Sequence, residues 1–322
     1  MQLSVVIPVW NDPEGLRRLL AQIAELGVFS QVVVVDDASS PACNAGAIGV
    51  DPSSYPLALK YLRIRKNRGA GHARNQGLKH VTGSHVLFFD SDDLFTPQIA
   101  ALVGSLQERE FDFCIFKHVD SRIRAAGGYG LLAGDERRWQ EAGAQGRLGA
   151  LSSAGAVKLC TIAAYPWNKI YRTAFLREQN IRCTEISIHN DIEIHWMSFL
   201  RAENILYSDH ICSEHFVTKG QSRLTNKTGR ERFEVMQALA NVQDEFATRP
   251  DILPFLEPYV GFYIDLFGWI TEQLEPELHG EFRHKAQEFL RQHLTVLLYT
   301  LATVNNSALG TRINGILRGQ AL

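Results

Sequence analysis

Four short apolar runs in the first ninety residues constrain the fold of this chain most. Leu3–Val9 is a nearly continuous hydrophobic run, and similar runs occupy 31–35, 59–64 and 86–89. Strands that read as continuous hydrophobic runs are usually covered on both faces, as in a parallel sheet. Helical periodicity separates the first two runs and the last two. This β-α-β-β-α-β order predicts an α/β fold with a right-handed, mostly parallel sheet and helices on both faces.

Acidic and amide side chains follow three of these runs directly, at Asn11, at 36–37 and at 90–93. Open α/β sheets bind ligands beyond the carboxyl ends of their strands, so the sequence predicts a binding site at this edge. The carboxylates of Asp90, Asp92 and Asp93 repel one another unless a hard cation such as Mg²⁺ or Mn²⁺ binds them. The alternative is a polar turn in which Asp92 or Asp93 caps the next helix.

Three further side chains at this edge are candidates for contacts to a nucleotide. Trp10 could stack on a base, although an aromatic residue at a strand end can equally serve packing. Asp37 could accept hydrogen bonds from a uracil or a ribose, or it could only cap the turn at 39–40. Arg74 is expected in a helix that faces the base or the phosphates. The preceding loop reads G-x-G without the third glycine, which makes it a poor dinucleotide fingerprint.

Composition excludes several classes of function. The chain has 322 residues and a net charge of −2, which gives no long-range attraction to nucleic acid. Its five cysteines are spread without a C-x-x-C pair, as in a reduced protein, and no zinc ligand set or H-E-x-x-H pattern is present. Met1 leads directly into a strand, and the longest apolar run, 294–304, is too short to span a bilayer. These features predict a cytoplasmic protein.

Five segments resemble the successive signatures of glycosyltransferase family 2. They are VVIPVWN at 5–11, VVVDDAS at 33–39, the N-R-G and A-R-N elements within 67–75, FFDSDD at 88–93, and WNKIYR at 167–172, which is similar to the W-N-K-x-Y-R element of bacterial members. The resemblance covers 1–226. It implies a GT-A fold that uses a nucleotide-diphosphate sugar, most often a UDP-sugar, and a divalent metal, Mn²⁺ or Mg²⁺.

The resemblance also implies roles for individual residues. Asp92 of the D-x-D motif would bind the metal, and His215 would be a second metal ligand, unless it is a histidine whose hydrogen bonds are satisfied in the core. Asp191 would be the base that deprotonates the acceptor hydroxyl, with capping of the next helix as the alternative. Asn190 stands where the family usually has Glu. The residues implied at the nucleotide are Pro8, Trp10, Asp37, Arg74 and Asp90.

Composition changes along the chain suggest its organisation. The stretch 120–155 is rich in Gly, Ala and Arg and is expected to bury little apolar area, as a mobile connection over the bound donor or as a solvated spacer. Amphipathic helical patterns follow 226, including 255–274 and 282–304. We therefore predict a catalytic domain at 1–226 and a helical extension at 227–322. The extension would pack on the catalytic domain, join a second copy in a homo-oligomer, or contact an acceptor lipid at the membrane surface.

These observations predict an inverting, metal-dependent transfer of a sugar from a nucleotide-diphosphate donor to a hydroxyl. The acceptor would be a glycan or lipid-linked glycan in the synthesis of a bacterial capsule, lipopolysaccharide or exopolysaccharide, at the inner face of the membrane. Two alternatives stay open. The first is a nucleotide-sugar-binding partner without turnover, for which Asn190 would be a sign of decay. The second is a nicotinamide-dependent oxidoreductase, which the missing third glycine disfavours.

Overall fold

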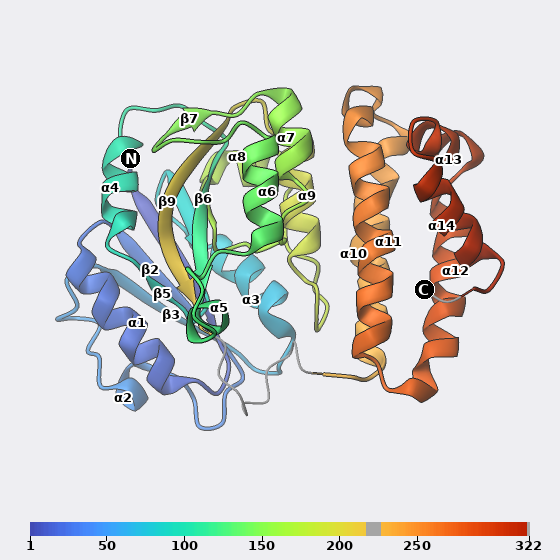
Figure 1. The fold of residues 1–322 in the computed structure, drawn as a ribbon. Coiled ribbons are helices and arrows are strands. Elements are labelled where there is room, and N and C mark those ends of the chain that lie inside the picture. The colour runs from blue at the N-terminus through green and yellow to red at the C-terminus, as the bar shows by residue number, and fades with distance from the viewer. Residues whose placement is uncertain (217–226, 321–322) are drawn as a thin grey trace.

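The computed structural model describes residues 1–216 and 227–320. Figure 1 shows a sheet covered by helices in the N-terminal part and a separate group of helices, drawn in orange and red, beside it. The connection between the two parts includes residues 217–226, which lie outside the described residues. The predicted division at 226/227 therefore stays a prediction.

The first half of the sheet follows the predicted order. Its four strands are β1 (Leu3–Val9), β2 (Gln31–Asp37), β3 (Ala58–Ile64) and β4 (His85–Phe88), with α1 (Pro13–Leu26), the short α2 (Ala45–Ile48) and α3 (Gly69–Leu78) between them. β1 pairs in parallel with both β2 and β4, and β2 pairs in parallel with β3. The four predicted strands are confirmed, with ends that differ by at most two residues.

The second half of the sheet is mixed. It contains β5 (Leu94–Phe95), β6 (Phe113–Asp120), β7 (Gly149–Ala150), β8 (Lys169–Arg172) and β9 (Ile205–His215). The strand order is β3-β2-β1-β4-β8-β6-β9-β5, and β7 pairs with β9. Because β8 runs antiparallel to both β4 and β6, the prediction of a mostly parallel sheet holds for β1 to β4 and not for the sheet as a whole.

Two hydrophobic cores cover the two faces of the sheet. On one face α1 and α4 (Gln98–Ser105) bury residues such as Leu16, Leu19 and Ile99. On the other face lie α3, α7 (Ser153–Leu159), α8 (Thr173–Glu178) and α9 (Ile192–Arg201), and this second core continues into the helices after 227. Helices on both faces were predicted and are confirmed.

The segment 120–155 is structured, contrary to the expectation that it buries little apolar area. It contains α5 (Ser121–Ala125) and α6 (Ala133–Glu141) before it reaches α7. Trp139 of α6 is only 3% exposed, and the Lys117 ammonium lies 5.4 Å from its ring centroid. Lys117 also pairs with Glu136 at 2.7 Å. One aromatic side chain thus anchors α6 to β6, which the average composition of the segment did not reveal.

The C-terminal extension is helical, as predicted. Its helices are α10 (Val235–Gln243), α11 (Leu256–Gln273), α12 (His279–His293), α13 (Val296–Thr303) and α14 (Ser307–Leu317), with short 3₁₀ turns η2 (Arg230–Glu234), η3 (Asp244–Ala247), η4 (Pro250–Phe255) and η5 (Pro276–Leu278). The pattern at 282–304 forms two helices because Thr295 caps a new one by accepting from Leu298 N. Among the described residues, no helix is both long and apolar enough to cross a bilayer.

Candidate active site

The strand ends predicted to form a binding edge come together because β1 lies between β2 and β4. All three strands run in the same direction, so their carboxyl ends meet at one edge of the sheet. Trp10 follows β1 and is 44% exposed. Asn11 has a left-handed backbone (φ 54°), and its Oδ1 accepts a 2.7 Å hydrogen bond from Ser40 N in the turn after β2. Pro8 is buried within β1, opposite Val35.

The two acids that end β2 have different partners. Asp36 accepts hydrogen bonds from Ser39 N at 2.8 Å and Cys43 N at 3.1 Å, so it shapes the turn after the strand. Asp37 accepts instead from the backbone N–H groups of Arg68 (2.9 Å) and Gly69 (2.7 Å) at the start of α3. Burial raises the pKa of Asp37, and these two bonds oppose the shift. The alternative in which Asp37 caps the turn at 39–40 is therefore wrong.

The acids after β4 do not cap the next helix. α4 begins after Pro97, which makes no side-chain capping bond, and its first backbone N–H, that of Gln98, donates to Thr96 Oγ1 at 3.2 Å. Asp93 is 1% exposed and accepts from the Nδ1 of His215 at 2.9 Å and from Phe216 N at 2.9 Å. Burial lowers the pKa of His215, but the hydrogen bond and charge of Asp93, with the charges of Asp92 and Asp90, outweigh it and raise the pKa. The sequence analysis did not assign this role to Asp93. The signal was its position as the third acid in the run 90–93.

The environment of His215 fits a metal ligand. Histidines that bind metals usually donate the N–H of one ring nitrogen to a carboxylate, which fixes the ring and directs the other nitrogen to the metal. The Asp93 bond to Nδ1 matches this arrangement, in which Nε2 would be the ligating atom. The ring also stacks on Trp167, with centroids 5.4 Å apart. These contacts hold the ring in one orientation.

The described residues contain no group of three or more His, Cys, Asp or Glu side chains arranged to hold a metal ion. Mg²⁺ and similar ions are commonly bound by one or two protein side chains together with the phosphates of a substrate. Asp92 and His215 are the residues that would hold the ion in such a site, together with the diphosphate of a substrate. His195 is excluded as a metal ligand because it is buried and its Nε2 contacts Cys160 O at 2.8 Å.

Arg74 connects Asp90, at the carboxyl end of β4, to the segment that carries Asp191. Its guanidinium, in α3, donates to Asp90 Oδ1 at 2.5 Å and to Asn190 Oδ1 at 2.7 Å. Burial lowers the pKa of Arg74, but Asp90 outweighs the effect and raises it, so the cation is stable. Arg74 was predicted to face a base or phosphate. This stays a prediction. The Arg74 side chain is 4% exposed and is engaged by two side chains of the protein.

Asp191 precedes α9 in the N-cap position, yet its side chain makes no capping hydrogen bond. The capping alternative is therefore wrong. Burial raises the pKa of Asp191 to about 6, and the charges of Arg74 and Lys169 lower it only in part. A carboxyl group with such a pKa is poised to accept a proton near neutral pH.

A glycine lets α3 approach the segment before Asp191. A Cβ at Gly71 would lie 2.3 Å from the carbonyl oxygen of Thr184 and 2.9 Å from the Cβ of Asn190. Real Cβ atoms do not come this close to another heavy atom, so any larger residue would push the two backbones apart. The G-x-G sequence lies at the start of α3, and its second glycine allows close packing between α3 and the segment that leads to Asp191.

Lys169 is a charged residue near Asp191 that sequence reasoning did not single out. It is fully buried and donates to Tyr165 O and Asn168 Oδ1, both at 2.7 Å. Burial lowers its pKa to about 7, and the charges of Asp191 and Asp135 oppose the shift. A lysine within the apolar W-N-K-x-Y pattern of a strand was the signal that could have identified it.

Residues 4–129 match the model of glycosyl transferase family 2. This N-terminal part of the chain is therefore similar to that family. The chain is 29% identical over 127 residues to the uncharacterized glycosyltransferase YwdF of Bacillus subtilis. This match covers 38% of the chain and 43% of YwdF. It is also 29% identical over 163 residues to undecaprenyl-phosphate 4-deoxy-4-formamido-L-arabinose transferase of Sodalis glossinidius, over 42% of the chain and 49% of that protein. The chain thus spans less than half of each relative.

The fold is similar to that of TarS from S. aureus, solved as residues 1–349 in complex with UDP-GlcNAc. The TM-score is 0.73 at 20% identity, and the match covers 99% of this chain and 93% of the TarS chain. The predicted GT-A fold is therefore confirmed. Because the match extends over almost the whole chain, the helices after 227 belong to the shared fold and not only the sheet.

Proposed function

We propose that this protein is an inverting glycosyltransferase that moves a sugar from a nucleotide diphosphate to a hydroxyl group. The proposal rests chiefly on one observation, the Arg74 guanidinium that joins Asp90 of the D-x-D motif to Asn190, the neighbour of Asp191. This link supports a single site that would contain both a binding edge for a diphosphate and a carboxyl group suited to proton transfer.

Asp191 acts as the base in the proposed reaction. Its carboxylate takes the proton of the acceptor hydroxyl while that oxygen attacks the anomeric carbon from the face opposite the nucleotide. The bond between the anomeric carbon and the diphosphate oxygen breaks, and the nucleotide diphosphate leaves with the electron pair. Arg74, held by Asp90 and Asn190, keeps positive charge beside both the base and the leaving group.

Asp92 and His215 would hold the divalent cation, Mn²⁺ or Mg²⁺. A cation bound there would offset the charge that develops on the departing diphosphate, an effect worth several kcal/mol in comparable sites. Asp93 orients His215 for this purpose through the bond to Nδ1. Trp10, Asp37 and the edge around Pro8 would line the nucleotide, with the exposed Trp10 ring available to stack on the base.

The comparisons support the donor and acceptor classes of this proposal. TarS has been solved with UDP-GlcNAc, which favours a UDP-sugar as donor. The relative in Sodalis glossinidius is named as an undecaprenyl-phosphate sugar transferase, which favours a glycan or lipid-linked acceptor in a bacterial surface polysaccharide. With such an acceptor, the protein would work in the cytoplasm at the inner face of the membrane.

A donor screen tests the proposal. We expect one of the UDP-, GDP- or dTDP-sugars, with Mn²⁺, to raise the melting temperature by about 2 °C or more at 100 times its Kd and to be hydrolysed slowly. Binding without hydrolysis or transfer would support the non-catalytic partner instead. Stabilisation by NAD, with none by any nucleotide sugar, would contradict the proposal and favour an oxidoreductase.

The rate should depend on pH through Asp191. Because burial raises the pKa of Asp191 to about 6, the carboxylate is protonated below this pH and cannot act as a base. We expect kcat/KM to be level above pH 7 and to fall about tenfold per unit below pH 6. The residual activity of an Asp191→Asn variant is the control, since it should lack this acidic limb. A wild-type profile that stays level down to pH 5 would remove Asp191 from the role of base.

A further inference from the structure

The helical extension packs against α9, the helix that Asp191 precedes. Trp196 of α9 is fully buried, and its ring meets Tyr259 of α11 with centroids 4.8 Å apart and Phe262 at 5.3 Å. These contacts join the extension to the catalytic domain through one apolar core. Apolar packing alone, however, allows small shifts along the interface. Polar contacts are needed to fix the register.

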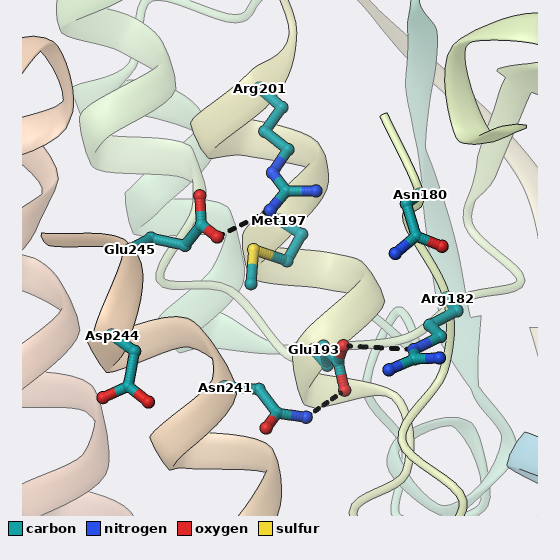
Figure 2. A pocket seen from close by; sticks show the side chains of 8 residues that line it. All are labelled: Asn180, Arg182, Glu193, Met197, Arg201, Asn241, Asp244 and Glu245. Atoms are coloured by element: carbon teal, nitrogen blue, oxygen red, sulfur yellow. Dashed lines mark hydrogen bonds and ion pairs between the residues drawn. The ribbon is translucent and has the colours of Figure 1, made fainter. Parts of the chain in front are cut away.

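Glu193, two residues after Asp191, makes such a contact. Its side chain is 6% exposed, and its Oε2 accepts hydrogen bonds from Thr184 Oγ1 at 2.6 Å and from Asn241 Nδ2 at 2.8 Å. Thr184 lies at the start of the segment that leads to Asp191, and Asn241 belongs to α10 of the extension. Figure 2 shows Glu193 between Asn241 and Arg182. One buried carboxylate therefore ties the base segment, α9 and the extension together.

Two further contacts come from the extension to the segment 184–191. Glu234, at the end of η2, accepts from Ser187 N at 2.7 Å. Trp269 of α11 meets the ring of His189 edge to face at 5.8 Å, and the Arg232 guanidinium lies 5.1 Å from the Trp269 ring centroid. His189 has a left-handed backbone (φ 63°) immediately before Asn190. The extension thus contacts this segment at Ser187 and His189, and α9 at Glu193, all within four residues of Asp191.

We propose that the helical extension positions the catalytic base, and that Asn241, Glu193 and Glu234 are positioning residues that fix the backbone on both sides of Asp191. This inference rests on the proposed function, because it assigns a role in the transfer reaction to residues that do not touch the substrate. It also gives a role to the apolar core that the helical extension shares with α9. A base displaced by about 1 Å can lose about 10²-fold in rate.

A second polar contact on the same interface provides a matched control. A pocket of about 260 Å³ lies between α9 and the helices η3 and α10, and its lining includes Asn241 and Glu193 as well as Arg201 and Glu245. Arg201 pairs with Glu245 at 2.6 Å. Arg201 is eight residues beyond Glu193, about 12 Å along the helix, and is therefore far from the base. The two contacts join the same two parts of the protein at different distances from Asp191.

The experiment compares Asn241→Ala with Glu245→Ala in the full chain. We expect Asn241→Ala to lower kcat about tenfold with the donor KM unchanged, and Glu245→Ala to leave kcat within twofold. Glu193→Gln, which keeps an acceptor oxygen, should retain most of the kcat that Glu193→Ala loses. Adding Asn241→Ala to Glu193→Ala should cost little more, because both changes remove the same interaction. An unchanged kcat in Asn241→Ala, or an equal loss in Glu245→Ala, would overturn the proposal.

Amide hydrogen exchange provides a measurement that does not need turnover. In Asn241→Ala and Glu234→Ala, the amides of 184–191 should exchange at least tenfold faster than in the wild type, whereas Glu245→Ala should leave them unchanged. Unchanged exchange in the first two variants would overturn the proposal even if their kcat fell. An inactive wild type with the expected exchange pattern would refute the proposed function and still support the anchoring of this segment by the extension.

Discussion

Replacing Asp191 with asparagine should lower kcat about 10²- to 10⁴-fold and leave the affinity for the donor nearly unchanged. Asparagine has almost the same shape as aspartate but cannot take the proton of the acceptor hydroxyl. The helix that follows should tolerate the change, because the Asp191 side chain makes no capping hydrogen bond and asparagine is a good N-cap residue. The loss would therefore report chemistry and not folding. Initial rates with saturating acceptor, together with donor binding, measure both quantities.

A matched change elsewhere makes the Asp191 result interpretable. Asp209→Asn removes one carboxylate charge from β9, where Asp209 Oδ2 accepts from Gly146 N in the loop before β7. This variant should keep its kcat, and its melting temperature should show the cost of one altered surface hydrogen bond. If Asp191→Asn retained wild-type turnover, another group would have to be the base. Lys169 would be the first to examine, because burial lowers its pKa to about 7 and it lies near enough to act electrostatically on Asp191.

The binding edge was predictable because it depends on local pattern. Each continuous hydrophobic run identifies a strand by itself, and parallel strands joined by helices have their carboxyl ends on one side. This is why Asn11, Asp37 and Asp90 could be assigned to one edge before any coordinates were known. The acids in these positions follow their strands immediately, so an error of two residues in a strand end did not change the outcome.

The second half of the sheet could not be predicted in the same way. β8 is four residues long, with a buried Lys169, and it lies between β4 and β6 in the antiparallel direction. Its place depends on contacts with residues about sixty to ninety positions away, and no local pattern encodes such partners. α6 is a similar case, because its single buried Trp139 decides the packing of a segment whose average composition is polar.

The hydrogen-bond partners of the side chains within the site could not be predicted from the sequence either. Arg74 was expected in a helix that faces the base or the phosphates, and the sequence did not reveal that Asp90 and Asn190 engage its guanidinium. The Asn190 that departs from the usual Glu is one of these partners. A neutral amide accepts from Arg74 without neutralising it, so the cation keeps more of its charge for the base and the leaving group than it would beside a glutamate.

Replacing Asp92 with alanine should abolish the part of donor binding that depends on the metal. In the proposed site the metal has two protein ligands, Asp92 and His215. The change removes one of them, and it is the ligand that carries a negative charge. We expect the affinity for UDP in the presence of Mn²⁺ to fall about 10²-fold, which corresponds to roughly 2.7 kcal/mol. In EDTA the variant and the wild type should bind UDP equally, since neither then has a cation for Asp92 to hold.

The comparison with His215→Ala separates metal binding from the structure of the edge. His215 is also bonded to Asp93. Among the described residues, its removal leaves that 1% exposed carboxylate with the Phe216 N–H bond alone, which should lower the melting temperature as well as UDP affinity. Asp92 is only partly buried, so Asp92→Ala should lower the melting temperature less than His215→Ala does. Titration calorimetry with UDP and Mn²⁺ decides the matter. Wild-type affinity in Asp92→Ala would exclude Asp92 as a ligand, and the assignment of His215 would then lose its partner.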